Sequence, residues 1–184
     1  DVMDGHFVRN ISYGPNFVHH VRRSVPEAFL DVHLMIERPD QYLQDFIDSE
    51  VDNISIHLEP EYDIGETLKR IRDAGISAGL AINPSTPLKN AEPFLDQIDL
   101  LLIMTVVPGF GGQKFMEEET MPKVVEACRT RSIRNLSFHI EVDGGIDAHT
   151  SEIAARNGAN VFVAGTSVFK AQDMAKALEV MRQN

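Results

Sequence analysis

Short apolar stretches alternate along the chain with segments whose apolar residues recur at the three- and four-residue spacing of amphipathic helices. Strands are expected as a stub that begins at Asp1 and then at residues 28–35, 53–58, 77–82, 98–106, 136–142 and 160–164. Helices are expected from Pro15, from Pro39, at 64–74, through Leu88, Ala91 and Leu95, and at 121–131, 148–157 and 173–182, with a turn at 165–167. The pattern predicts a strand–helix unit that repeats across one domain, residues 1–184.

The stretch 98–106 is continuously apolar, which indicates burial on both faces, as in a parallel sheet. Parallel strands linked by helices form either a doubly wound sheet or a (β/α)8 barrel. A barrel brings all strand ends to one mouth, and one polar or glycine residue ends each predicted strand. These residues are Asp1, His33, His57, Asn83, Thr105, Asp143 and Gly165. Their placement favours the barrel.

Composition and charge exclude several classes of partner. The formal net charge of −11 argues against nucleic acid, because phosphate neutralisation needs clustered lysine and arginine. No apolar run reaches the roughly 18 residues that a membrane span needs. The single cysteine is typical of a reducing compartment, and we expect a cytoplasmic protein. Basic pairs such as Arg22 and Arg23 are expected to be solvated surface.

Three strand-end side chains are candidates for a metal site. Two carboxylates, Asp1 and Asp143, and the imidazole of His33 suit Zn²⁺, Fe²⁺, Mn²⁺ or Co²⁺. A hydrogen-bonded polar cluster without metal explains the same residues equally well. Three methionines in the same layer either fill the core or wall a site from water: Met3, Met35 and Met104. His57 and His139 are expected to be structural.

Glycine-rich turns follow three successive predicted strands and precede helices. They are the loop with Gly109, Phe110, Gly111 and Gly112, the pair Gly144–Gly145, and Gly165 with Thr166. Glycines let backbone N–H groups approach a phosphate, and helix N-termini favour its negative charge. The three turns together predict a phosphate site, and the loop 108–115 is a candidate lid.

The same residues resemble the ribulose-phosphate 3-epimerase family. The matching segments spread over the chain and are residues 1–8, 31–35, 104–106, 108–115, 141–145 and 165–167. The resemblance implies a TIM barrel of the ribulose-phosphate-binding type that epimerises D-ribulose 5-phosphate and D-xylulose 5-phosphate through an enediolate. It also implies a phosphorylated sugar substrate, one divalent metal ion and a homo-oligomer.

Roles for individual residues follow from the resemblance alone. Asp1 and Asp143 would be the acid/base pair and metal ligands, with His33 as a further metal ligand and substrate contact. Met3, Met35 and Met104 would line the reacting face. The substrate would also contact Asp143 and the glycine turns, that is Gly109, Phe110, Gly111, Gly112, Gly144, Gly145, Gly165 and Thr166.

The chain departs from the family pattern at its start. The family has a further metal-binding histidine two residues before the aspartate matched by Asp1, and a first strand–helix unit before that. We therefore expect a barrel that lacks its N-terminal strand–helix unit in this chain. Two alternatives stay open: an epimerase for a six-carbon ketose phosphate such as allulose 6-phosphate, and an inactive truncated barrel that only binds phosphate.

Overall fold

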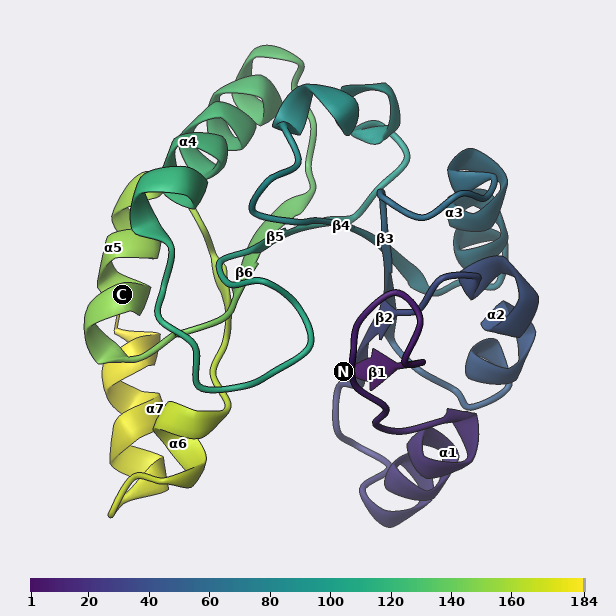
Figure 1. Ribbon diagram of the computed structural model, residues 1–184, viewed down its shortest axis with the longest axis horizontal. Coiled ribbons are helices and arrows are strands. Elements are labelled where there is room, and N and C mark those ends of the chain that lie inside the picture. The colour runs from purple at the N-terminus through teal and green to yellow at the C-terminus, as the bar shows by residue number, and fades with distance from the viewer. Residues whose placement is uncertain (184) are drawn as a thin grey trace.

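Seven parallel strands form one curved sheet in the computed structural model, which describes residues 1–183 (Figure 1). Each strand pairs with the next strand along the chain, so the spatial order equals the sequence order. The strands are β1 (Val2–Met3), β2 (Asp31–Met35), β3 (Asn53–His57), β4 (Ser77–Ile82), β5 (Leu100–Met104), β6 (His139–Asp143) and β7 (Val161–Val163). This sheet is a curled, partly open barrel of the (β/α)8 TIM-barrel type, which confirms the predicted fold class.

Helices cover the convex side of the sheet, from α1 at one end of the arc to α7 at the other (Figure 1). They are α1 (Pro15–Ser24), α2 (Pro39–Ile47), α3 (Ile64–Asp73), α4 (Glu117–Ile133), α5 (Ala148–Asn157), α6 (Thr166–Phe169) and α7 (Met174–Arg182). Pro15 and Pro39 begin two of them, as proline prefers the first helical turn. None of the helices in residues 1–183 combines the length and apolar composition that crossing a membrane requires.

The two faces of the sheet carry different side chains because neighbouring residues in a strand point to opposite faces. Residues such as Leu34, Ile56 and Leu101 belong to the large core beneath the helices. A second, smaller cluster lies on the concave face and comprises Ala81, Leu100, Leu102 and Met104. Most concave-facing positions of β2, β3 and β6 are instead polar, among them Asp31, His33, Asn53, Ser55, His57, Glu141 and Asp143. The chemistry-bearing residues therefore lie inside the barrel.

Two predicted elements differ in type from the structure, and several others differ only in their bounds. The helix expected through Leu88, Ala91 and Leu95 is a pair of short 3₁₀-helices, η1 (Leu88–Asn90) and η2 (Glu92–Phe94). Pro93 lies inside η2 and lacks the N–H that a continuous α-helix would use. The turn expected at 165–167 instead begins helix α6.

The prediction that Arg22 is solvated surface was wrong. Its side chain is only 12% exposed, and its guanidinium forms an ion pair with Asp52 at 2.5 Å. The guanidinium also donates hydrogen bonds to the carbonyl oxygens of Glu50, Pro26 and Ala28. Arg22 therefore fastens α1 to the segments that precede β2 and β3.

Replacing Arg22 with alanine is expected to lower the free energy of unfolding by about 2–3 kcal/mol, because several carbonyl groups and Asp52 lose a charged partner. Urea unfolding followed by circular dichroism measures this change. The matched control is Arg23→Ala on the same helix, since Arg23 is exposed and should change the free energy by less than about 0.5 kcal/mol. Equal effects of the two substitutions would contradict the anchoring role of Arg22.

Candidate active site

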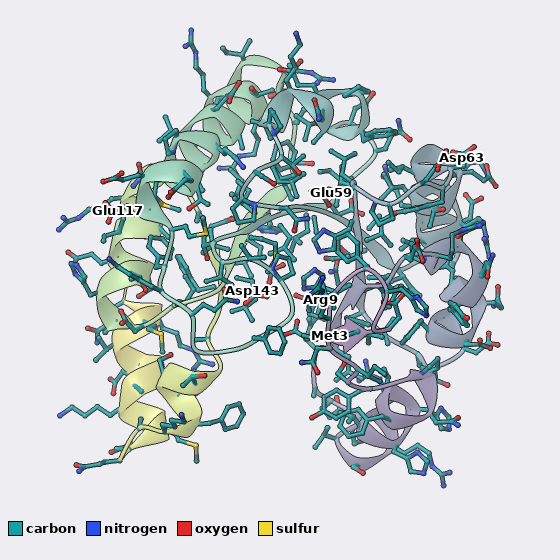
Figure 2. The ribbon with its side chains drawn as sticks, viewed as in Figure 1. Met3, Arg9, Glu59, Asp63, Glu117 and Asp143 are labelled. Atoms are coloured by element: carbon teal, nitrogen blue, oxygen red, sulfur yellow. The ribbon has the colours of Figure 1, made fainter. Side chains whose placement is uncertain are left out.

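A cavity of about 350 Å³ opens at the carboxyl ends of the strands. We call it the site cavity. Its walls combine strand ends with the loops after β5, β6 and β7: Asp1, Met3, Met35, Met104, Val106, Pro108, Gly109, Phe110, Gly111, Gly112, Gln113, Asp143, Gly144, Gly145, Ile146, Asp147, Val163, Gly165, Thr166 and Ser167. Figure 2 shows Met3, at the end of β1, and Asp143, at the end of β6, near the middle of the molecule.

Three ionisable groups meet at the base of the site cavity. One ligand atom each from Asp1, His33 and Asp143 lies within 4.8 Å of the others. Nδ1 of His33 is 3.3 Å from Oδ1 of Asp1 and 3.8 Å from Oδ2 of Asp143. This nitrogen is buried and has no hydrogen-bond partner among the described residues. Two carboxylate oxygens around a bare imidazole nitrogen are a donor set that fits a divalent metal ion.

A second histidine and a glutamate lie behind His33. Nε2 of His33 is 2.9 Å from Nε2 of His57, and Nδ1 of His57 is 2.8 Å from Oε2 of Glu59. Burial lowers the pKa of both imidazoles to about 4, although the charge of Asp143 raises that of His33 and the hydrogen bond to Glu59 raises that of His57. Burial therefore favours the neutral form of both rings.

Asp143 has a different environment from Asp1. Its side chain is 15% exposed, whereas that of Asp1 is 47% exposed. Burial raises the pKa of the Asp143 carboxyl, and the neighbouring His33 opposes this shift. A carboxylate with a raised pKa is a stronger proton acceptor than an exposed aspartate.

The turn after β6 requires its two glycines. Gly144 and Gly145 have φ values of +121° and +68°. A Cβ atom on Gly144 would lie 2.4 Å from Cγ2 of Val106, and one on Gly145 would lie 2.7 Å from the backbone nitrogen of Phe115. The hydroxyl of Thr105 donates to the carbonyl of Gly144 at 2.6 Å and fastens this turn to the end of β5. The turn thus packs against the loop between β5 and α4.

Two loops from distant parts of the chain meet over the concave side (Figure 1). Nδ2 of Asn10, in the loop after β1, donates to the carbonyl of Gly109 at 2.8 Å. Within the second loop, Nε2 of Gln113 donates to the carbonyls of Val107 and Phe110. These hydrogen bonds hold the loop 107–115 over the site cavity.

Helix N-termini border the other side of the cavity. At α5 the side chain of Asp147 accepts from the backbone N–H groups of His149 and Thr150, so a carboxylate already caps this helix. At α6 the N-cap is Gly165, which provides no side-chain cap. No lysine or arginine belongs to the cavity wall in the described part of the chain. Polar donors for an anion are therefore backbone groups of the glycine turns and of the start of α6.

The structure brings together nearly all residues that the sequence singled out. Every candidate named for the metal, the acid/base pair and the substrate lines the site cavity except His33, which is 6% exposed and lies behind the wall. Sequence analysis missed Gln113 and Asp147 on the wall, and it treated His57 as structural without its contact to His33. A glutamate two residues after a strand-end histidine, Glu59, was the available signal.

The parallel sheet, the polar strand ends and the glycine turns around one cavity define a TIM-barrel enzyme. The family model described as "Ribulose-phosphate 3 epimerase family" matches residues 1–169. The ribulose-phosphate 3-epimerase of Bacillus subtilis is 43% identical, over 99% of this chain and 83% of that protein. The Escherichia coli enzyme of the same name is 37% identical, over 99% of this chain and 80% of that protein. The chain belongs to the ribulose-phosphate 3-epimerase family, whose members are isomerases that act on carbohydrates.

Solved structures with low sequence identity agree with the fold. 3-Hexulose-6-phosphate synthase from Salmonella typhimurium superimposes with a TM-score of 0.68 at 18% identity, covering 92% of this chain and 78% of that one. 3-Keto-L-gulonate-6-phosphate decarboxylase from Vibrio cholerae gives a TM-score of 0.69 at 14% identity, covering 97% of this chain and 86% of that one. These similarities support the barrel architecture.

Proposed function

We propose that this chain interconverts D-ribulose 5-phosphate and D-xylulose 5-phosphate by metal-dependent proton transfer at C3. One observation carries the proposal: the carboxylates of Asp1 and Asp143 converge with the unpartnered Nδ1 of His33 within 4.8 Å at the base of a cavity. Membership of the epimerase family supports the reaction type. The metal ion and the route through an enediolate are our inference.

The reaction needs one acid/base group on each face of the substrate. The hydrogen at C3 is acidic because the neighbouring C2 carries a ketone. When a carboxylate removes it, the electron pair of the C–H bond moves into the C2–C3 bond. The π pair of the C2 carbonyl moves onto the carbonyl oxygen, and an enediolate forms. A carboxylic acid on the opposite face then returns a proton to C3 with inverted configuration. Asp1 and Asp143 fill these two roles, and their order reverses with the direction of the reaction.

Asp1, His33 and Asp143 would hold the metal ion, which we expect to be Zn²⁺, Fe²⁺, Mn²⁺ or Co²⁺. When bound, a divalent ion stabilises the negative charge that develops on the substrate oxygens as the proton leaves. The methionines Met3, Met35 and Met104 line the same cavity and would exclude water from the reacting carbon.

The phosphate would bind to backbone N–H groups rather than to basic side chains. Gly144, Gly145, Gly165 and Thr166 lie together on the cavity wall, and the start of α6 has no competing side-chain cap. Backbone groups at such turns attract phosphate without a formal positive charge. Gly109, Phe110, Gly111 and Gly112 would cover the phosphate from the loop after β5.

The deciding experiment compares kcat/KM for D-ribulose 5-phosphate and for allulose 6-phosphate, with metal content measured on the same preparation. We expect a clear preference for the five-carbon substrate and activity that a chelator removes and a divalent ion restores. A preference for the six-carbon sugar would overturn the substrate assignment. Binding of the sugar phosphates without turnover would instead support the inactive barrel. The cytoplasmic location, the homo-oligomer and the single domain stay predictions.

A further inference from the structure

His57 and Glu59 form a hydrogen-bonded chain that leads away from the site cavity. The chain runs from Nε2 of His33 to Nε2 of His57 at 2.9 Å, and from Nδ1 of His57 to Oε2 of Glu59 at 2.8 Å. Neither His57 nor Glu59 lines the cavity, and His57 is fully buried. Figure 2 shows Glu59 apart from Met3 and Asp143. These two residues cannot touch the substrate, so any role in the reaction must act through His33.

Glu59 determines which atom donates in each hydrogen bond of this series. Its other oxygen, Oε1, accepts from the backbone N–H of Asn83 at 2.7 Å and from the hydroxyl of Thr86 at 2.5 Å. These contacts and His57 keep the pKa of the Glu59 carboxyl below its usual range although burial opposes them. A carboxylate has no proton to give, so Nδ1 of His57 must be the donor to Oε2.

The proton positions then follow along the chain. In a neutral His57 whose Nδ1 carries the proton, Nε2 is an acceptor. The proton between the two Nε2 atoms therefore belongs to His33. In a neutral His33 this leaves Nδ1 as a bare lone pair. That is the buried nitrogen that lacks a hydrogen-bond partner and lies between Asp1 and Asp143.

We propose that Glu59 acts through His57 to hold His33 in the tautomer whose Nδ1 lone pair faces Asp1 and Asp143. The inference rests on the proposed function only where it assigns that lone pair to a metal ion. Two further contacts fix the His57 ring: the hydroxyl of Tyr62 donates to its backbone carbonyl, and the Phe7 ring packs against it with centroids 4.6 Å apart. Glu59 and His57 are thus positioning residues for His33.

The substitution Glu59→Gln tests this row of hydrogen bonds because glutamine must reverse the donor and acceptor in each of them. The two donors at Oε1, from Asn83 and Thr86, require the amide oxygen at that position. The amide NH₂ must then face Nδ1 of His57, which becomes an acceptor. His57 consequently carries its proton on Nε2 and donates it to His33, whose remaining proton moves to Nδ1. The substitution keeps the shape of the side chain and changes only the direction of the chain.

The first readout is the tautomer of each histidine in the metal-free full chain, measured by long-range ¹H–¹⁵N correlation NMR. We expect protonated Nε2 in His33 and protonated Nδ1 in His57, with both assignments reversed in Glu59→Gln. His139, whose Nδ1 lies 2.9 Å from Asn160 at the other end of β6, should be unchanged and serves as internal control. Wild-type protein with a proton on Nδ1 of His33, or an unchanged tautomer in Glu59→Gln, would overturn the proposal.

The second readout is the affinity for Zn²⁺ from calorimetric titration. Loss of an outer-shell partner typically weakens metal affinity 10- to 100-fold, and we expect a loss of that size for Glu59→Gln. The matched control is Thr86→Val, which removes one donor to Glu59 but keeps the carboxylate and the Asn83 contact, so tautomers and affinity should stay close to wild type. If Glu59→Gln does not fold, the tautomers of the wild-type protein still test the proposal. A reversed tautomer in Thr86→Val would contradict the proposal.

The two readouts separate this inference from the proposed function. Wild-type protein that binds no Zn²⁺ would refute the metal site, whereas the NMR tautomers would still decide the direction of the chain. Equal Zn²⁺ affinity for wild type and Glu59→Gln despite reversed tautomers would overturn the assignment of the Nδ1 lone pair of His33 to the metal ion, while the role of Glu59 in setting the tautomer would stand.

Discussion

Asp143→Asn is expected to lower kcat/KM by about 10³-fold in both directions of the reaction, because an amide cannot accept or return the proton at C3. Asparagine keeps the size of the side chain, so the site cavity should keep its shape. Coupled assays for each sugar phosphate measure the rates, and metal analysis of the variant reports how much of the loss reflects a weaker metal site.

The matched control for Asp143→Asn is Asp147→Asn. Asp147 also lies on the cavity wall, but it caps α5 and is not one of the converging carboxylates. Asparagine is an equally good N-cap, so this variant should retain activity within a few-fold of wild type. A loss as large as that of Asp143→Asn would mean that any missing negative charge in the cavity disables the enzyme.

Exchange of the C3 hydrogen with solvent distinguishes the acid/base groups on the two faces of the substrate more sharply than the rate of epimerisation does. In D₂O, Asp143→Asn should still exchange the C3 hydrogen of one epimer through the partly exposed Asp1, without forming the other epimer. Asp1→Asn should exchange the opposite epimer through Asp143. Exchange of both epimers by either variant would contradict the assignment of one carboxylate to each face.

The free energy of unfolding of the wild-type protein is expected to fall by about 3 kcal/mol between about pH 5 and pH 8. The substitution Glu141→Gln is expected to remove most of this fall. Glu141 lies on the concave face of β6 and is only 1% exposed. Burial, followed by the charge of Asp31 and the hydrogen bond to it, raises the pKa of the Glu141 carboxyl from its usual 4.5 to about 9.

The sign follows from proton binding. Above pH 4.5 the unfolded chain releases the Glu141 proton, whereas the folded chain keeps it until about pH 9. The free energy of unfolding therefore falls as pH rises through this window, and the full stability is present only below the unfolded pKa. Glutamine does not titrate and can donate a hydrogen bond to Asp31 at every pH. The free energy of unfolding of the variant, relative to that of the wild type, should thus increase as pH rises.

Urea unfolding of both proteins at several pH values measures this effect. The control is Glu126→Gln on α4, where the side chain is exposed and the substitution should change the free energy of unfolding by less than about 0.5 kcal/mol. Parallel pH profiles for wild type and Glu141→Gln would show that the folded protein ionises Glu141 at an ordinary pKa.

Local patterns along the chain predict this fold well because a parallel barrel repeats one local unit. The continuous apolar stretch around β5 and the glycine after α5 are examples, since Gly158 ends that helix with φ +112°. The 3₁₀ turns at 88–94 escape prediction because their apolar spacing is helical while Pro93 interrupts the backbone hydrogen bonds. The spacing of apolar residues alone does not indicate whether the helical pattern or the proline decides the local structure.

Prediction of the site succeeded for residues at strand ends and failed for contacts between them. Asp1, His33 and Asp143 were recognisable because a barrel converges strand ends. The burial of Arg22 depends on carbonyl groups of other segments, and the contact of His57 with His33 depends on the pairing of β2 with β3. Such partners become visible only when the register of the strands is known.

The hydrogen bond between Asn10 and Gly109 joins residues 99 positions apart in the sequence. Asp1 and Asp143, whose carboxylates converge in the site cavity, are separated by an even longer stretch of sequence. Contacts of such long sequence separation carry a large loop-closure entropy and are slow to form. Helices and neighbouring strand pairs can assemble before the first and sixth strands meet. During refolding, recovery of catalysis should therefore lag behind recovery of helical signal, so that activity reports the last step of assembly.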